Sequence, residues 1–179
     1  IAEIGSNHNN DIVGTKALIT EIASAGADAI KFQLFNANVL VGIDSDNYDE
    51  VKKLEVGQEL LRQSMNFAHA LGLDFGLSVF CANTLKVAVE LEVDFLKIAS
   101  SEFTNRSLVH AIVDTDLPFA ASCGMADRLD VESFLALMKS FSPKNAVLMQ
   151  CTTEYPCPLK RLNLHYLKSL NQQNIVTGF

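Results

Sequence analysis

The sequence predicts an α/β fold with a parallel sheet, and we favour a (β/α)8 TIM barrel, truncated before its eighth strand. Short apolar runs alternate with amphipathic stretches of helical length along the whole chain, which indicates parallel strands joined by helical crossovers. Polar residues follow nearly every apolar run, as in a barrel whose site draws on many strands. An open doubly wound sheet satisfies the same alternation, but it favours a glycine-rich phosphate loop after its first strand, and Gly5-Ser6-Asn7-His8-Asn9-Asn10 is not one.

Seven segments are expected to be strands, because their apolar runs are typical of strands covered on both sides of a sheet. In chain order they are residues 1–5, 29–35, 75–80, 95–100, 118–123, 146–151 and 175–179. The chain ends at Phe179, inside or just after the last of them, so the eighth strand is expected beyond this sequence.

Helices are expected between the strands, at residues 14–25, 57–71, 84–91, 107–113, 131–141 and 162–170. Gly26 and Gly72 mark two helix exits. The one long connection, residues 36–56, is acidic and polar, and we expect a loop over the ligand face there.

Composition narrows the class of protein. The chain has 179 residues, 49% of them hydrophobic and 20% charged, which fits one globular domain, residues 1–179. A net charge of −7 argues against a nucleic-acid or anionic-membrane surface, and no apolar run is long enough to span a membrane. Its four cysteines follow no zinc or CxxC spacing, which favours a reduced, cytoplasmic location.

Two lysines stand in apolar strand runs, where a charge is costly unless an anion pairs with it. Lys31 lies within residues 29–35 and Lys97 within residues 95–100, each near the carboxyl end of its strand. Ligands of α/β folds bind at those ends, so the two lysines indicate an anionic substrate.

Side-chain alternation predicts which polar residues share the face of these lysines. Gln33 shares the face of Lys31, and Glu3, Lys31, Lys97 and Gln150 are expected to converge at the barrel mouth. One carboxylate beside two ammonium groups leaves a positive surplus that suits a phosphate or a carboxylate. The alternative is a structural salt bridge between Glu3 and one of the lysines.

Hydroxyls at the strand ends could donate hydrogen bonds to phosphate oxygens, although each is singly more typical of a helix N-cap. They belong to Ser78, Ser100, Ser101, Ser122, Thr152 and Thr153. Glu102 either caps the next helix or holds a substrate hydroxyl, and His8 is either an acid–base or metal group or a hydrogen-bonded loop residue.

Several motifs together resemble the sialic acid synthase family, in the same order and along the whole chain. These are Ala2-Glu3-Ile4-Gly5-Ser6-Asn7-His8-Asn9, Ala25-Gly26-Ala27-Asp28-Ala29-Ile30-Lys31-Phe32-Gln33, Leu96-Lys97-Ile98-Ala99-Ser100-Ser101-Glu102, Ser122-Cys123-Gly124-Met125 and Gln150-Cys151-Thr152-Thr153-Glu154-Tyr155-Pro156 followed by Asn163-Leu164. The family condenses phosphoenolpyruvate with an N-acetylated amino-sugar aldehyde such as N-acetylmannosamine, giving a nonulosonic acid and phosphate. The resemblance implies a (β/α)8 catalytic domain, a following antifreeze-like domain that is absent from this chain, a homodimer, and a divalent metal, Mn²⁺ or Mg²⁺.

The resemblance also implies roles for individual residues. Lys31, Lys97, Ser78, Ser100 and Ser122 would hold the phosphoenolpyruvate phosphate and carboxylate, Gln33 and Tyr155 would face the sugar, and Glu3 would move a proton or order water. Asn7 and Glu102 are further candidates for substrate contact. Gln150 stands where some members have a metal-binding histidine, and the second histidine ligand follows a Ser-Asp-His motif expected just after Phe179.

Three departures accompany the resemblance. Asn10 stands where the family often has glycine, so the backbone there is expected to need a positive φ that asparagine tolerates. Cys81 and Cys123 replace residues that are commonly Asp and Thr.

Two other functions remain open for this sequence. One is another phosphoenolpyruvate-dependent 3-deoxy-sugar acid synthase, and the other is a non-catalytic barrel that binds a sugar or a partner.

Overall fold

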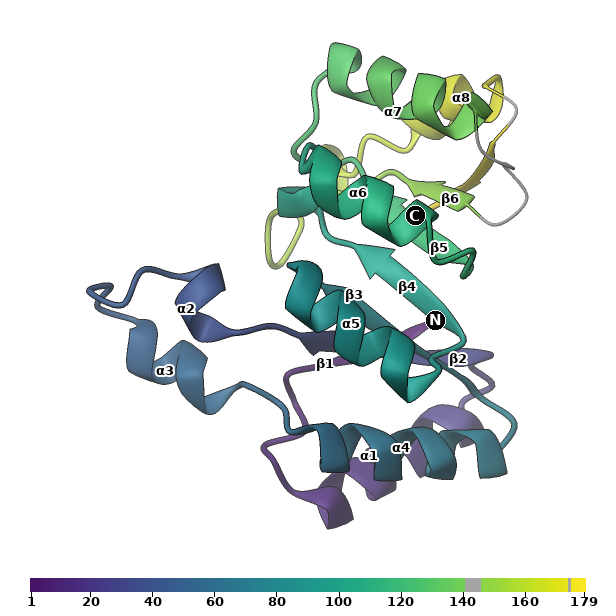
Figure 1. Ribbon diagram of the computed structural model, residues 1–179. Coiled ribbons are helices and arrows are strands. Elements are labelled where there is room, and N and C mark those ends of the chain that lie inside the picture. Colours follow the sequence, from purple (N-terminus) through teal and green to yellow (C-terminus); the bar gives the residue numbers. More distant parts are fainter. Residues whose placement is uncertain (141–145, 174) are drawn as a thin grey trace. The chain divides into compact units, whose positions relative to one another are not determined.

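A computed structural model describes residues 1–140, 146–173 and 175–179, and these hold seven strands whose order in the sheet is their order in the chain (Figure 1). The strands are β1 (Ala2–Gly5), β2 (Ala29–Leu34), β3 (Asp74–Val79), β4 (Phe95–Ile98), β5 (Phe119–Ser122), β6 (Ala146–Met149) and β7 (Val176–Gly178). The pairs β1–β2, β2–β3, β5–β6 and β6–β7 are parallel. The fold is therefore the expected truncated barrel, and every expected strand is confirmed to within two residues at each end.

Helices alternate with these strands as expected. They are α1 (Ile12–Ser24), α2 (Ala37–Leu40), α3 (Tyr48–Lys53), α4 (Gln58–Ala70), α5 (Ala82–Leu91), α6 (Arg106–Val113), α7 (Arg128–Ser140) and α8 (His165–Asn171). Residue 141, the last residue of one expected helix, lies outside the described residues. In the described segments no helix combines the length and the apolar character that crossing a bilayer requires.

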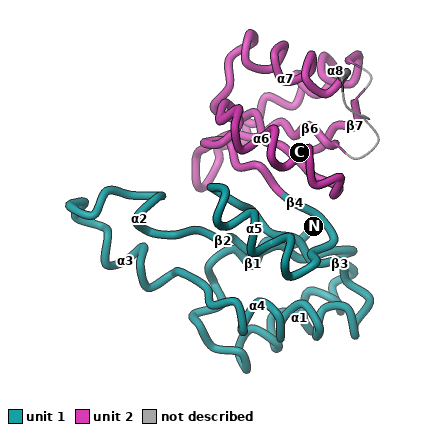
Figure 2. The backbone as a smooth tube through the Cα atoms, viewed as in Figure 1, with its two compact units in different colours: residues 1–96 teal, residues 97–179 magenta. Residues whose placement is uncertain are grey.

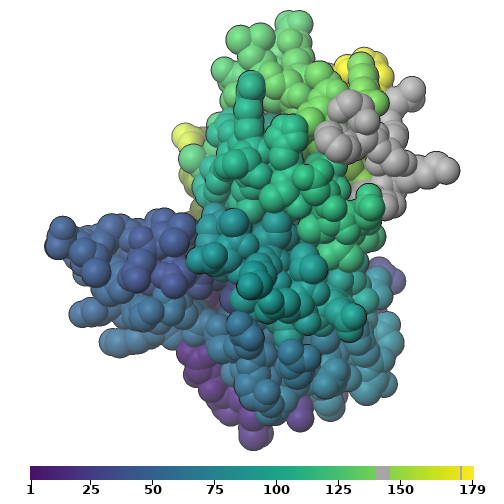
Figure 3. Space-filling view, viewed as in Figure 1, coloured from purple at the N-terminus to yellow at the C-terminus, as the bar shows by residue number. Residues whose placement is uncertain are grey.

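The connection at residues 36–56 is not the plain loop that was expected, because it contains α2 and α3. Asn36 starts α2 by accepting a hydrogen bond from the Asn38 backbone N–H. In α3, acidic residues occupy the first turn and lysines the last, which complements the helix dipole. We call residues 36–56 the arm; Figure 3 shows it in blue, standing out from its surroundings in the first part of the chain.

The chain forms two compact units, Ile1–Leu96 and Lys97–Phe179, which are described separately (Figure 2). In the first unit, the rings of Phe32 and Phe75 pack with centroids 5.3 Å apart, and both side chains are fully buried. Gly76 leaves room for the Phe95 ring, because a Cβ at position 76 would overlap that ring. This close approach fixes the start of β4 against β3.

In the second unit, α6 and α7 supply apolar side chains beside β5 and β6. Phe103 and Phe134 stack with centroids 4.8 Å apart, while Ile112 and Leu148 have no exposed surface. Asn105 begins α6 by accepting a hydrogen bond from the Leu108 backbone N–H.

Candidate functional site

Lys31 lies in the first unit, on β2, with its side chain 9% exposed. Its Nζ donates to Ser78 Oγ on β3 at 2.8 Å and forms an ion pair with Glu3 on β1. The strand register explains the pair, because Glu3 and Lys31 are directly opposite each other. The structure thus contains the Glu3–Lys31 salt bridge that was the structural alternative, and it compensates the cost of burying Lys31.

Gly5 gives the Glu3 side chain its space. Gly5 has φ +60°, and a Cβ there would lie 3.2 Å from Glu3 Oε1. The β1–β2 register shifts between Glu3 and Gly5, so the strand is irregular where the carboxylate folds over it. The irregular end of β1 is therefore what leaves one carboxylate beside the buried lysine.

The other predicted residues of this unit have different environments. Gln33 is half-buried and pairs in register with Ser78, so it lies on the strand that carries Lys31. Asn7 is exposed, and its side-chain amide donates to the Ile4 carbonyl at 3.1 Å. Asn7 therefore closes the turn that follows β1.

His8 is buried, with 2% of its surface exposed and its ring stacked on Phe32. Nδ1 accepts a hydrogen bond from the Asn10 N–H at 3.0 Å, while Nε2 has no partner of normal hydrogen-bond geometry. Burial lowers the pKa of His8, and the Leu54 carbonyl opposes that shift only in part. The bond to Nδ1 fits a hydrogen-bonded loop residue, and an acid–base or metal role for His8 stays a prediction.

The turn beyond His8 is left-handed, as the departure at position 10 predicts. Asn9 and Asn10 have φ values of +46° and +54°. Asparagine tolerates this region better than most residues, so the positive φ expected at Asn10 is confirmed.

Lys97, in the second unit, donates to a serine hydroxyl of the neighbouring strand, as Lys31 does in the first. Its Nζ donates to Ser122 Oγ at 2.5 Å and to the Ile98 carbonyl at 2.9 Å. Ser122 Oγ lies 3.1 Å from Cys151 Sγ, so a chain of polar contacts joins β4, β5 and the end of β6. The serine oxygen accepts from the ammonium group, which leaves its own proton for another acceptor.

Gly124 brings two further backbone segments close together. A Cβ at this position would lie 2.7 Å from the Cys151 carbonyl oxygen and 3.0 Å from Ser100 Oγ. Glycine is therefore the residue that allows the loop after β5 to approach both the Cys151 carbonyl and Ser100.

Glu102 lies in the short 3-10 turn that begins at Ser100. Its carboxylate accepts a hydrogen bond from the Asn105 side chain at 2.9 Å. Glu102 thus steadies the capping residue of α6.

A cleft of about 540 Å³ opens in the second unit at the carboxyl ends of β5 and β6. Its walls combine the predicted Gln150, Thr152 and Thr153 with residues that the sequence did not single out as site residues. It is lined by Cys123, Gly124, Ala126, Asp127, Arg128, Gln150, Cys151, Thr152, Thr153, Glu154, Arg161, Asn163 and Tyr166. Tyr155 is not among them, and it is 95% exposed.

The cleft's charged residues are mostly paired. Arg161 donates to Glu154 at 3.0 Å, and Arg128 donates to Glu132 at 2.7 Å. Burial raises the pKa of Tyr166, and Arg128 opposes that rise. Asn163 belongs to a motif of the family block, whereas neither Arg161 nor Tyr166 stands in a pattern that would have singled it out.

Gln150 is 6% exposed, and its amide group is used for protein contacts. Nε2 faces the carbonyls of Cys151 and Leu162 at 3.4 Å, while Oε1 lies 4.0 Å from Cys123 Sγ. Burial and the nearby Cys151 raise the pKa of the Cys123 thiol, which disfavours a thiolate ligand. Among the described residues, no group of three or more His, Cys, Asp or Glu is placed to hold a metal ion.

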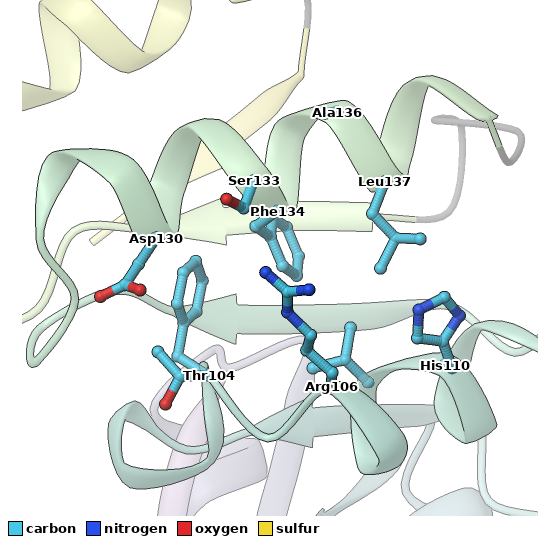
Figure 4. A pocket seen from close by; sticks show the side chains of 10 residues that line it. Thr104, Arg106, His110, Asp130, Ser133, Phe134, Ala136 and Leu137 are labelled. Atoms are coloured by element: carbon cyan, nitrogen blue, oxygen red, sulfur yellow. The ribbon is translucent and has the colours of Figure 1, made fainter.

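A separate cavity of about 400 Å³ lies between α6 and α7 (Figure 4). Arg106 and His110 line it from α6, while Asp130, Ser133 and Phe134 line it from α7. None of the predicted site residues borders this cavity.

Comparison with known proteins places the chain among related sequences. The family model described as NeuB family matches residues 18–179. The chain is 31% identical to N,N'-diacetyllegionaminic acid synthase of Legionella pneumophila over 188 residues, covering 95% of this chain and 53% of that protein. It is 30% identical over 180 residues to an uncharacterized protein of Methanocaldococcus jannaschii, covering 100% of this chain and 53% of that protein.

A solved structure agrees with the sequence comparisons. The N-acetylneuraminic acid synthetase of Leptospira borgpetersenii, in complex with citrate, matches with a TM-score of 0.92 and 28% identity. The match covers 99% of this chain and 62% of that one. The chain thus spans about half the length of the curated relatives it matches.

Proposed function

This chain belongs to the NeuB family, and from that premise we propose that the protein containing it condenses phosphoenolpyruvate with an N-acetylated amino-sugar aldehyde. The products are a nonulosonic acid and inorganic phosphate. The observation that carries the proposal is a lysine–serine pair that occurs twice, as Lys31–Ser78 and Lys97–Ser122.

Each pair is suited to one anionic group. In each pair the serine oxygen accepts from the lysine, so the serine proton is available to an anion oxygen, although Glu3 already balances the charge of Lys31. Phosphoenolpyruvate carries two such groups, a phosphate and a carboxylate. Fixed donors of this kind stabilise charge without rearranging during the reaction.

The reaction requires the enol carbon of phosphoenolpyruvate to attack the aldehyde carbon, after which water adds at the carbon that bears phosphate and phosphate leaves. Glu3 is our candidate for ordering that water or accepting its proton, because its side chain is 48% exposed while it contacts Lys31. Gln33, two residues beyond Lys31, is the candidate for contact with the sugar, and Ser100 contributes a hydroxyl beside Gly124.

The family resemblance implies a divalent metal that would polarise the aldehyde. Gln150 is the only residue we propose as a ligand from this chain, and its amide already bonds to backbone carbonyls. We therefore assign no step to metal chemistry here. The homodimer and the cytoplasmic location remain proposals for the whole protein.

The test is an assay of the full-length protein for phosphate release. Phosphoenolpyruvate would be combined with N-acetylmannosamine, its 6-phosphate, a diacetamido sugar, and the aldose phosphates used by 3-deoxy-sugar acid synthases. We expect phosphate release that depends on both phosphoenolpyruvate and an N-acetylated sugar. Release only with aldose phosphates would assign the protein to a different synthase, and no release with any acceptor would overturn an enzymatic role.

A further inference from the structure

The arm is tied to the loop that follows β1 by hydrogen bonds that are distant in sequence. The Asn10 Nδ2 group donates to the carbonyls of Lys53 and Glu55, both at 3.1 Å. Asn10 reaches this position because its backbone adopts φ +54°. One side-chain amide therefore holds the end of the arm across more than forty residues of sequence.

The two ends of the arm are also joined to each other. Glu55 Oε1 accepts a hydrogen bond from the Ala37 backbone N–H at 2.6 Å, and Glu55 Oε2 pairs with Lys52 at 2.8 Å. Although burial raises the pKa of Glu55, the bonds from Lys52 and Ala37 outweigh that effect and lower it overall. Glu55 thus closes the base of the arm, and Asn10 fastens this base to the β1–α1 loop.

The arm follows β2 directly, at the end of the strand that carries Lys31 and Gln33. Phe35 fixes this junction, because its ring meets Phe80 edge-on with centroids 6.2 Å apart, and Ala37 has no exposed surface. Loops after parallel strands lie on the ligand side of such folds. In contrast, no residue of α3 is buried, so the position of the outer arm depends on its base.

We propose that Asn10 is a positioning residue that sets the arm over the carboxyl end of β2 and thereby determines affinity for the amino sugar. This inference rests on the proposed function. The proposed action of Asn10 runs through the carbonyls of Lys53 and Glu55 and requires no contact with the substrate.

The test compares Asn10→Gly with Asn9→Gly in the full-length protein. Both positions have positive φ, so glycine suits both backbones, but of these two residues it is Asn10 whose side chain bonds to the arm. Asn10→Gly should raise the rate of hydrogen exchange of residues 37–54 by about tenfold, because losing two exposed hydrogen bonds lowers the free energy of opening of the arm by an amount that corresponds to about that factor. Exchange in β2 and β3 should be unchanged. Asn9→Gly should leave the arm's exchange at the wild-type rate.

Kinetics provide the second readout. Asn10→Gly should raise KM for the amino sugar about tenfold, with a much smaller change in KM for phosphoenolpyruvate. Asn10→Asp should be no better, because a carboxylate cannot donate to the two carbonyls. Unchanged exchange in the arm would overturn the anchor, as would equal effects of the two glycine variants. Faster exchange in Asn10→Gly with an unchanged sugar KM would overturn the role in affinity. If the wild-type protein had no synthase activity but Asn10→Gly still exchanged faster in the arm, the proposed function would be overturned and the anchor would stand.

Discussion

Lys31 and Lys97 each bind a serine hydroxyl from a neighbouring strand, but their surroundings differ. Lys31 lies between a carboxylate on β1 and a hydroxyl on β3, with its charge balanced by Glu3. Lys97 donates to a hydroxyl and a backbone carbonyl, and its serine continues to the thiol of Cys151. The first arrangement ties a lysine into an ion pair, whereas the second extends a polar chain to the edge of a cleft. Removing a partner should therefore affect stability more in the first unit and binding more in the second.

Lys97→Ala should have the largest effect, about a hundredfold loss of affinity for phosphoenolpyruvate, because charged hydrogen bonds to an anion are lost. Calorimetric titration of the full-length protein measures this, and Lys86→Ala, at an exposed position of α5, is the matched control. If Lys97→Ala bound phosphoenolpyruvate as tightly as the wild type, Lys97 would have no part in the anion site.

Gly124→Ala should lower the free energy of unfolding by about 2 kcal/mol, because the added methyl group would press against the Cys151 carbonyl and Ser100. Gly42→Ala is the control, since a Cβ there would meet no residue beyond its two chain neighbours within 4 Å. Urea unfolding of the two variants compares them. Equal stabilities would show that the loop after β5 yields easily and does not define the cleft.

Glu3→Gln should destabilise the first unit by about 1–2 kcal/mol, because it leaves the buried Lys31 without its counter-charge. The loss is moderate because solvent screens the charge of Glu3, whose side chain is about half exposed. Glu90→Gln breaks an exposed pair with Lys86 and should change stability by less than about 0.5 kcal/mol. If the two variants proved equally stable, the contrast between the two lysines would lose its basis.

His8 should give the smallest effect, a dependence of stability on pH. The folded state lowers the pKa of His8, so the unfolded chain binds the proton more readily. The contribution of neutral His8 is fully present above about pH 6.5 and is lost as the pH falls toward the lower, folded-state pKa. Unfolding curves between pH 8 and 5 should show this loss, and His8→Gln should flatten it. An identical pH profile in the variant would contradict it.

The strands could be predicted because the signal is local. The apolar composition of each run is enough to indicate a buried strand. The helices of the arm were missed although they carry local signals, a cap at Asn36 and charges that suit the two ends of α3. The bonds of Asn10 to Lys53 and Glu55 could not be predicted, because they join positions that are distant in sequence. Arg161 and Tyr166 were not predicted as site residues, because only the folded chain brings them to the cleft.

The structure contains some of the contacts expected of single site residues, whereas other expected roles stay predictions. A salt bridge between Glu3 and one of the lysines was the structural alternative, and it forms with Lys31, which lies opposite Glu3 in the strand register. Tyr155 is exposed and does not line the cleft, and its expected contact with the sugar stays a prediction. The convergence of Glu3, Lys31, Lys97 and Gln150 on one substrate stays a prediction.

The contact between Gly76 and Phe95 links two positions that lie nineteen residues apart in the sequence. A larger residue at position 76 fits only if the ring at position 95 becomes smaller, and a smaller residue at 95 leaves a hole that a larger residue at 76 can fill. Each change alone is harmful, and together they restore the volume. We therefore expect substitutions at positions 76 and 95 to be correlated among related sequences, rather than independent.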